Sequence, residues 1–143
     1  MMKNKVLTIM LIMMVAITLV GVIAVVVVTK VGEPTSAESE PSIDEIVKAS
    51  VEIPEITTNL AGNDFIKISF TIQTDSKKAK EELEKRNFQV QNIIITELSE
   101  TKAEQLTGKK GKEALQTKIK EEVNKVMQEG QVVKVYITSS ILQ

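Results

Sequence analysis

Hydrophobic and polar positions follow several patterns along the chain, and the first is a run with no charged interruption. Residues 6–28 contain no charged side chain, and their least apolar members are Thr8, Thr18 and Gly21. As an α-helix rising ~1.5 Å per residue, this run would be about 34 Å long, enough to cross a hydrocarbon core of about 30 Å. We therefore predict a transmembrane helix whose anchoring side chains include Val6, Leu7, Leu11, Val15, Leu19, Val22 and Val26.

A cleaved signal peptide is the alternative for this segment. Lys3 and Lys5 would supply its positive N-terminal region, and residues 35–37 (Thr-Ser-Ala) loosely resemble a cleavage site. The apolar run is longer, however, than the roughly 7 to 15 residues typical of a secretory signal. Its length favours a helix that is retained as an anchor.

The charges flanking the apolar run predict its orientation. Lys3 and Lys5 precede it, whereas Lys30 is soon followed by acidic residues. The excess of lysine on the N-terminal side favours a cytoplasmic position for residues 1–5 and an extracytoplasmic position for the rest of the chain.

The overall net charge of -1 conceals an uneven distribution. Residues 33–64 hold eight acids and one base, whereas residues 65–143 hold 14 bases and 11 acids. Residues 29–51 are poor in bulky apolar side chains at their start, so we expect an acidic linker there. Within it, Ser42 followed by Asp44 and Glu45 is typical of a helix start and predicts a short helix at 42–49.

Alternation with a period of two predicts strands in the remaining domain, residues 52–143. In residues 65–74 every second side chain is apolar, which indicates a strand with one buried face. A turn at 61–64 precedes it. Residues 56–60 predict an edge strand, because Pro54 is incompatible with an interior strand position. Val133, Val135, Ile137 and Ile141 predict the apolar face of a C-terminal strand.

Helical patterns fill the region between these strands. Asp75 or Ser76 can cap a helix at 77–86, which turns only Ala79 and Leu83 inward. Residues 88–98 have strand propensity at 93–96 but an apolar repeat of four, so helix is favoured and strand remains open.

Two further helices and a loop complete this region. Residues 101–104 fit a capping box that starts a short helix ending at Gly108. Residues 108–112 predict a flexible basic loop, and a helix follows at 113–129, stopped by Gly130. Because the last strand must return to the earlier hairpin, the order of elements predicts an α+β domain.

The composition of the chain excludes most familiar kinds of enzyme active site. The chain has no Cys and no His, which excludes disulfides, thiolate metal sites, cysteine nucleophiles and Ser-His-Asp triads. Glu81, Glu82 and Glu84 have lysines at helical spacing, so we interpret them as a solvated helix face rather than an acid pair or calcium site. We expect no enzyme, no cofactor and no bound metal.

Lys109, Lys110 and Lys112 are the most concentrated basic residues of the C-terminal domain. They lack the spacing of a phosphate-binding loop, so we interpret them as an exposed loop, with docking of a partner as the open alternative. The basic excess of this domain is only three and aromatic residues are scarce, so nucleic-acid binding is not expected.

Several short segments, taken in order, are typical of a known family. They are residues 58–60 (Thr-Asn-Leu), 65–72 (Phe-Ile-Lys-Ile-Ser-Phe-Thr-Ile), 106–108 (Leu-Thr-Gly), 111–115 (Gly-Lys-Glu-Ala-Leu) and 133–143 (Val-Lys-Val-Tyr-Ile-Thr-Ser-Ser-Ile-Leu-Gln). Behind a short basic N-terminus, one span and an acidic linker, this order resembles the FliL family of flagellar basal-body-associated proteins.

The resemblance implies a function that composition alone does not. It implies a stomatin-like (SPFH-like) domain outside the cytoplasmic membrane, assembled with copies of itself in a ring around the stator proteins of the flagellar motor. The ring would support torque, motility and swarming. Two alternatives stay open: a general membrane scaffold of stomatin type, and an extracytoplasmic ligand-binding module not linked to motility.

Overall fold

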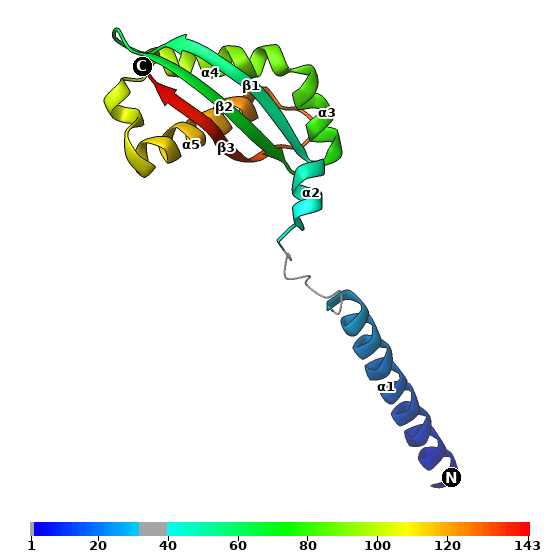
Figure 1. The fold of residues 1–143 in the computed structure, drawn as a ribbon. Coiled ribbons are helices and arrows are strands. Elements are labelled where there is room, and N and C mark those ends of the chain that lie inside the picture. Colours follow the sequence, from blue (N-terminus) through cyan, green and yellow to red (C-terminus); the bar gives the residue numbers. More distant parts are fainter. Residues whose placement is uncertain (1, 32–39) are drawn as a thin grey trace. The chain divides into compact units, whose positions relative to one another are not determined.

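The computed structural model describes residues 2–31 and 40–143, with side chains described for residues 4–23 and 40–143. The chain divides into two compact units, Met1–Glu40 and Pro41–Gln143, and each is considered by itself. Figure 1 shows the first as a single long helix and the second as a sheet with helices. The predicted linker at 29–51 falls partly on residues 32–39, which lie outside the described residues.

The first unit is the helix α1, Met2–Val31. Its Asn4–Ile23 portion has a mean hydropathy of 2.9, which makes it long and apolar enough to cross a membrane. The hydroxyls of Thr8 and Thr18 donate to the backbone oxygens of Asn4 and Met14, at 2.7 and 2.6 Å. Both polar groups are therefore satisfied within the helix, as an apolar surrounding requires.

The second unit, which we call the head, is built on a three-stranded antiparallel sheet in the order β1-β2-β3. Its strands are β1 (Ser50–Asn59), β2 (Phe65–Thr74) and β3 (Val132–Leu142). The predicted bounds of β2 are confirmed, and its alternate side chains Ile66, Ile68, Phe70 and Ile72 are buried. The last strand returns to pair with β2, as the order of elements predicts.

The prediction for β1 was wrong in its bounds. The strand starts at Ser50 and passes through Pro54, because Pro54 and Glu55 form a bulge between the pairs Ile53↔Phe70 and Ile56↔Ile68. A proline without an N–H is tolerated at a bulge on an edge strand. The expectation that β1 lies at an edge is confirmed.

The predicted apolar face of β3 was wrong at both ends. Val132, not Val133, is fully buried, and Ile141 is 49% exposed. The register shifts opposite Gln73/Thr74 and opposite Ser69/Phe70 insert one extra β3 residue each. Because side chains alternate with a period of exactly two along a strand, each insertion moves the following side chains to the other face.

Helices cover one face of this sheet (Figure 1). They are α3 (Lys77–Lys85), α4 (Asn87–Glu100) and α5 (Gly108–Val126), with the 3-10 turn η1 (Ala103–Leu106) between the last two. Ala79 and Leu83 are the buried residues of α3, and the Ser76 hydroxyl accepts from the Ala79 N–H, as predicted. Residues 88–98 are helical, and Val90, Ile94 and Leu98 are buried against the sheet.

A short helix, α2 (Ile43–Lys48), precedes β1. Its predicted start is confirmed: Ser42 is the N-cap, and its backbone N–H donates to Glu45 Oε2 at 2.8 Å. This hydrogen bond lowers the pKa of the Glu45 carboxyl below its usual value. The cap fixes where the chain enters the head.

The prediction of a flexible loop at 108–112 was wrong, because α5 already starts at Gly108. A Cβ atom on Gly111 would collide with the backbone oxygen of Gln105 in η1. Gly111 is therefore required for the close approach of α5 to η1, and not for flexibility. The helix also ends at Val126, three residues before the predicted end.

The predicted capping box at 101–104 was also wrong. The Thr101 hydroxyl donates to the Glu97 backbone oxygen at 2.6 Å and so belongs to the end of α4. The backbone N–H of Lys102 donates to Gln105 Oε1 at 2.9 Å. The start of η1 is thus stabilised one residue further along than predicted.

Candidate functional site

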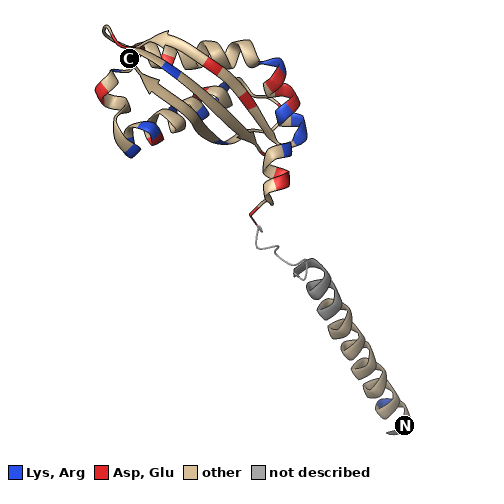
Figure 2. Cartoon of the chain, in the orientation of Figure 1, with Lys and Arg blue, Asp and Glu red and all other residues tan. Residues whose placement is uncertain are grey.

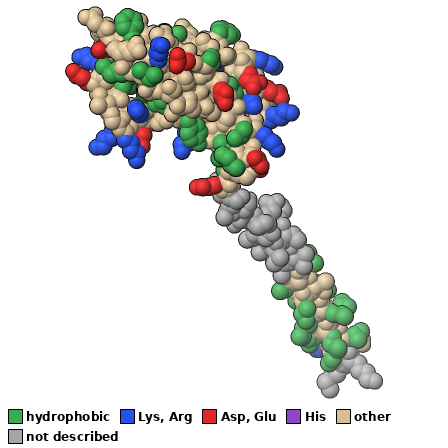
Figure 3. Space-filling model, in the orientation of Figure 1, with side chains coloured by type: hydrophobic (Ala, Val, Ile, Leu, Met, Phe, Trp, Pro, Cys, Tyr) green, Lys and Arg blue, Asp and Glu red, His purple; other side chains and the backbone are tan. Residues whose placement is uncertain are grey.

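The predicted membrane-anchoring side chains lie on α1. Val6, Leu7, Leu11, Val15, Leu19 and Val22 are each 54–71% exposed, which is a costly arrangement for apolar groups in water. The Lys5 side chain is exposed near the start of the helix. The side chains of Lys3 and Val26 lie outside the described residues. Figure 3 shows hydrophobic side chains along the described part of α1.

The three predicted partner-binding lysines lie in the first turns of α5. Lys109 and Glu113 form an ion pair at 3.6 Å, and the two side chains are 87% and 57% exposed. Lys110 and Lys112 are exposed as well. The helix therefore presents its basic residues to solvent on a rigid element.

Lys109 and Lys112 line an open groove between the start of α5 and residues 137–140 of β3. The groove has a volume of about 630 Å³. Its walls combine lysine ammonium groups, the Glu113 carboxylate and the Thr and Ser hydroxyls of β3. Such a lining suits a polar or negatively charged segment better than an apolar ligand.

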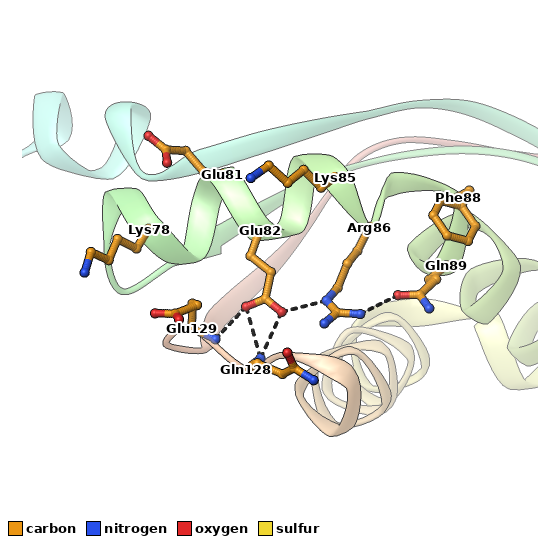
Figure 4. Close-up of a pocket in the computed structure, with 9 residues that line it drawn as sticks. All are labelled: Lys78, Glu81, Glu82, Lys85, Arg86, Phe88, Gln89, Gln128 and Glu129. Carbon is orange, nitrogen blue, oxygen red and sulfur yellow. Dashed lines mark hydrogen bonds and ion pairs between the residues drawn. The ribbon is translucent and has the colours of Figure 1, made fainter.

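A second groove, of about 600 Å³, lies where α3 meets the connection from α5 to β3 (Figure 4). At its centre Glu82 accepts from Arg86 Nε at 2.6 Å. Glu82 also accepts from the backbone N–H groups of Gln128 at 3.0 Å and Glu129 at 2.6 Å. The Glu82 side chain is only 12% exposed.

These bonds decide the chemistry of Glu82. The hydrogen bond from the Glu129 N–H is the main cause that lowers the pKa of the Glu82 carboxyl, and Arg86 and Gln128 add to the effect. A carboxylate saturated with donors is a poor general base, so we interpret this group as structural. The interpretation of Glu82 as part of a solvated helix face was wrong, because its partners lie 46 and 47 residues away in the sequence.

The face of the sheet turned away from the helices is largely polar. On it, the Tyr136 hydroxyl donates to Gln73 Oε1 at 2.9 Å, and Lys134 Nζ lies 5.0 Å from the centroid of the Tyr136 ring. Phe65 at the start of β2 is 53% exposed, and Phe88 at the start of α4 is 73% exposed. Ile141, whose partner on β2 is Lys67, is 49% exposed on the same face as Phe65.

Within residues 40–143 and the described part of α1, no group of three acidic side chains could hold a metal ion. The buried polar side chains described there all have hydrogen-bond partners. The features that stand out are therefore surfaces: the exposed apolar α1, and the basic groove at α5 and β3.

Comparison with known proteins gives two findings. Residues 50–143 match the model of the family described as flagellar basal body-associated protein FliL. The chain is 49% identical over 112 residues to the flagellar protein FliL of Bacillus subtilis (strain 168), an alignment that covers 78% of this chain and 80% of that protein.

Proposed function

The chain belongs to the FliL family of flagellar basal body-associated proteins, and from this membership we propose that it is a non-enzymatic accessory subunit of the flagellar motor. In this proposal copies of the chain form a ring in the cytoplasmic membrane around stator units. The ring supports torque and swarming motility.

The single observation that carries the proposal is the family match over the whole sheet and helix layer of the head, residues 50–143. The chemistry of the head supports it, since one of its two grooves is built around the Glu82 carboxylate, whose hydrogen bonds make it a poor general base. A motor accessory protein needs surfaces and an anchor, and α1 is apolar enough to serve as that anchor.

We further propose the following domain organisation and membrane topology for the chain. Residues 1–5 lie in the cytoplasm, residues 6–28 span the membrane, residues 29–51 form an acidic linker, and residues 52–143 form the extracytoplasmic domain of stomatin-like architecture. Lys3 and Lys5 set the orientation through the positive-inside bias. The compact unit Pro41–Gln143 includes α2, which belongs to the linker in this proposal.

Deletion of the gene, followed by complementation, tests the motor function. We expect the deletion to reduce swarming and the swimming speed in viscous medium, and the full chain to restore both. A variant lacking residues 6–28 should not restore them. Normal motility in the deletion strain, accompanied by altered membrane organisation, would favour a general membrane scaffold instead.

The proposed orientation has a separate test. Protease added to intact protoplasts should digest the head of the full chain and leave a cytoplasmic control protein uncut. Protection of the head until the cells are lysed would contradict the proposed topology.

A further inference from the structure

The two edges of the head's sheet differ in how they are protected. The edge of β1 is interrupted by the bulge at Pro54 and Glu55. The start of β3 is closed by Asn124, whose side chain accepts from the Val132 N–H at 2.7 Å and donates to the Val132 oxygen at 3.0 Å. This side-chain clamp takes the place of a neighbouring strand at Val132.

The far half of β3 has no such clamp among the hydrogen bonds described for the head. Gln143 and Phe65 exchange both backbone hydrogen bonds, at 2.8 Å each. In an antiparallel pair these bonded positions alternate, so the backbone groups of Leu142 and Ser140 point away from β2. Residues 137–140 also form one wall of the groove at the start of α5.

The charge beside this edge is positive. Lys109 and Lys112 line the groove, and Lys110 is exposed in the same turn of α5. The first turn of α5 contains no acidic residue and has no side-chain cap, so the partial positive charge of the helix end adds to that of the lysines. Glu113 neutralises only part of this charge.

The opposite edge is acidic. The exposed charged side chains there are Glu52 and Glu55 on β1 and Asp44, Glu45 and Lys48 on α2, four acids against one base. Figure 2 shows acidic positions along β1 and basic positions at the start of α5, on different sides of the head. The head therefore carries acidic side chains at the β1 edge and basic side chains of α5 beside the β3 edge.

We propose that the β1 side of a second copy of this chain docks through its side chains against the β3 edge and the groove at the start of α5, with Glu55 at the β1 bulge facing Lys109 and Lys112. The inference rests on the ring of the proposed function and names the surfaces that form it. Two different patches meet in such a contact, which makes it heterologous, and a repeated heterologous contact closes into a ring when its rotation allows.

The direction of the strands is compatible with this contact. β1 and β3 are each antiparallel to β2, so they run in the same direction. Each head is joined to its own α1 through the residues before α2. Copies anchored in one membrane can therefore present the β1 edge of one head beside the β3 edge of the next without turning a head over.

Charge reversal and disulfide cross-linking of the full chain in membranes test this contact. Reversal of one side, in K109E/K112E or in E55K, should weaken self-association at least about tenfold, because like charges then face each other. The combination of all three substitutions should restore it. The matched control K77E/K78E, two exposed lysines of α3, should leave it unchanged.

Because the chain has no cysteine, introduced cysteines report only the contact in question. Copies carrying S140C should cross-link to co-expressed copies carrying E55C, and neither variant should cross-link when expressed alone. Products from S140C alone would indicate a two-fold contact and overturn the proposal.

The outcomes separate this inference from the proposed function. Self-association that is insensitive to both charge reversals, with no S140C–E55C product, would overturn the named surfaces and leave the ring intact. A wild-type chain that stays monomeric in the membrane would overturn both. Restoration by the combined variant supports the contact and also shows that the single-sided variants fold.

Discussion

At the scale of single residues, Glu82 shows how one side chain can organise a region of the fold. It holds Arg86 of its own helix and the backbone of Gln128 and Glu129, just beyond the end of α5. Since these backbone N–H groups follow the last turn of α5, the carboxylate fixes the path of the chain into β3. The lysines at helical spacing predict a solvent-exposed Glu82. Its hydrogen bonds to these N–H groups instead hold its carboxylate against the end of α5.

The substitution E82Q should destabilise the head and change its response to acid. The folded state lowers the pKa of Glu82 below its usual value of 4.5, so this group adds stability above that pH and loses it as the pH falls through the folded-state pKa. Thermal unfolding followed by circular dichroism should show a lower midpoint for E82Q at pH 7 than for the wild type. The difference should narrow in acid.

E81Q is the matched control for this prediction, because Glu81 is exposed on the same helix. It should unfold like the wild type at both pH values. An E82Q protein as stable as E81Q at pH 7 would show that the bonds to Gln128 and Glu129 contribute nothing.

Gly111 provides a second prediction at this scale. In an exposed helix G111A would be stabilising, since Ala has the higher helix propensity. Here the added Cβ meets the backbone of Gln105, so we expect a loss of about 1–3 kcal/mol in the free energy of unfolding. Chemical denaturation measures it, with K110A as the control on the same turn; a stabilised G111A would contradict the close approach.

At the scale of elements, the helices owe their positions to narrow apolar faces. α3 buries only Ala79 and Leu83, whereas α4 and α5 each bury three side chains. Four-residue spacing places Val90, Ile94 and Leu98 on one stripe of α4. Residues 88–98 have local propensity for both helix and strand, and the packing of this stripe on the sheet therefore decides that they are helical.

Two neighbouring isoleucines of α4 distinguish the effect of core packing on stability from the effect of helix propensity. Ile94 is fully buried and Ile95 is 40% exposed. I94A should lower the free energy of unfolding by about 2–5 kcal/mol, because it removes buried methyl groups and leaves a cavity. I95A should cost less than about 1 kcal/mol. Urea denaturation of the two variants distinguishes them, and equal effects would contradict the assigned face.

At the scale of the whole molecule, the chain joins an apolar helix to a compact α+β head. The described side chains of α1 are exposed throughout, whereas the head buries most of its apolar side chains in one core. These are the properties of a lipid-facing element and of a water-facing domain. The division supports the proposed anchoring of α1.

A charge in the middle of α1 tests that anchoring. V15K places a lysine near the centre of Asn4–Ile23, where insertion into a membrane is disfavoured by roughly 2.5–3.5 kcal/mol. We expect a larger share of the protein in the soluble fraction after alkaline extraction of membranes. V15L should remain in the membrane fraction, and equal extraction of both variants would argue against a spanning helix.

Local patterns in the sequence determined the long apolar helix, the alternating strand β2, the inward residues of α3 and α4, and the return of β3 to the hairpin. Each follows from periodicity within a short window, or from the few connections that a short chain allows. The bulge at Pro54, the two register shifts of β3 and the partners of Glu82 did not follow, because each depends on groups distant in the sequence. The early start of α5 did not follow either, because its glycines are typical of a loop and the close contact of Gly111 with Gln105 exists only in the folded chain.

The candidate surface illustrates the same limit. The sequence singled out Lys109, Lys110 and Lys112 but placed them in a loop. In the structure they lie in the first turns of α5, which approaches η1 closely at Gly111 and borders the far half of β3. The acids of β1 likewise become a complementary edge only once the strand order is known. The sequence determines which residues are charged, but only the packing of strands and helices determines on which side of the head each charge lies.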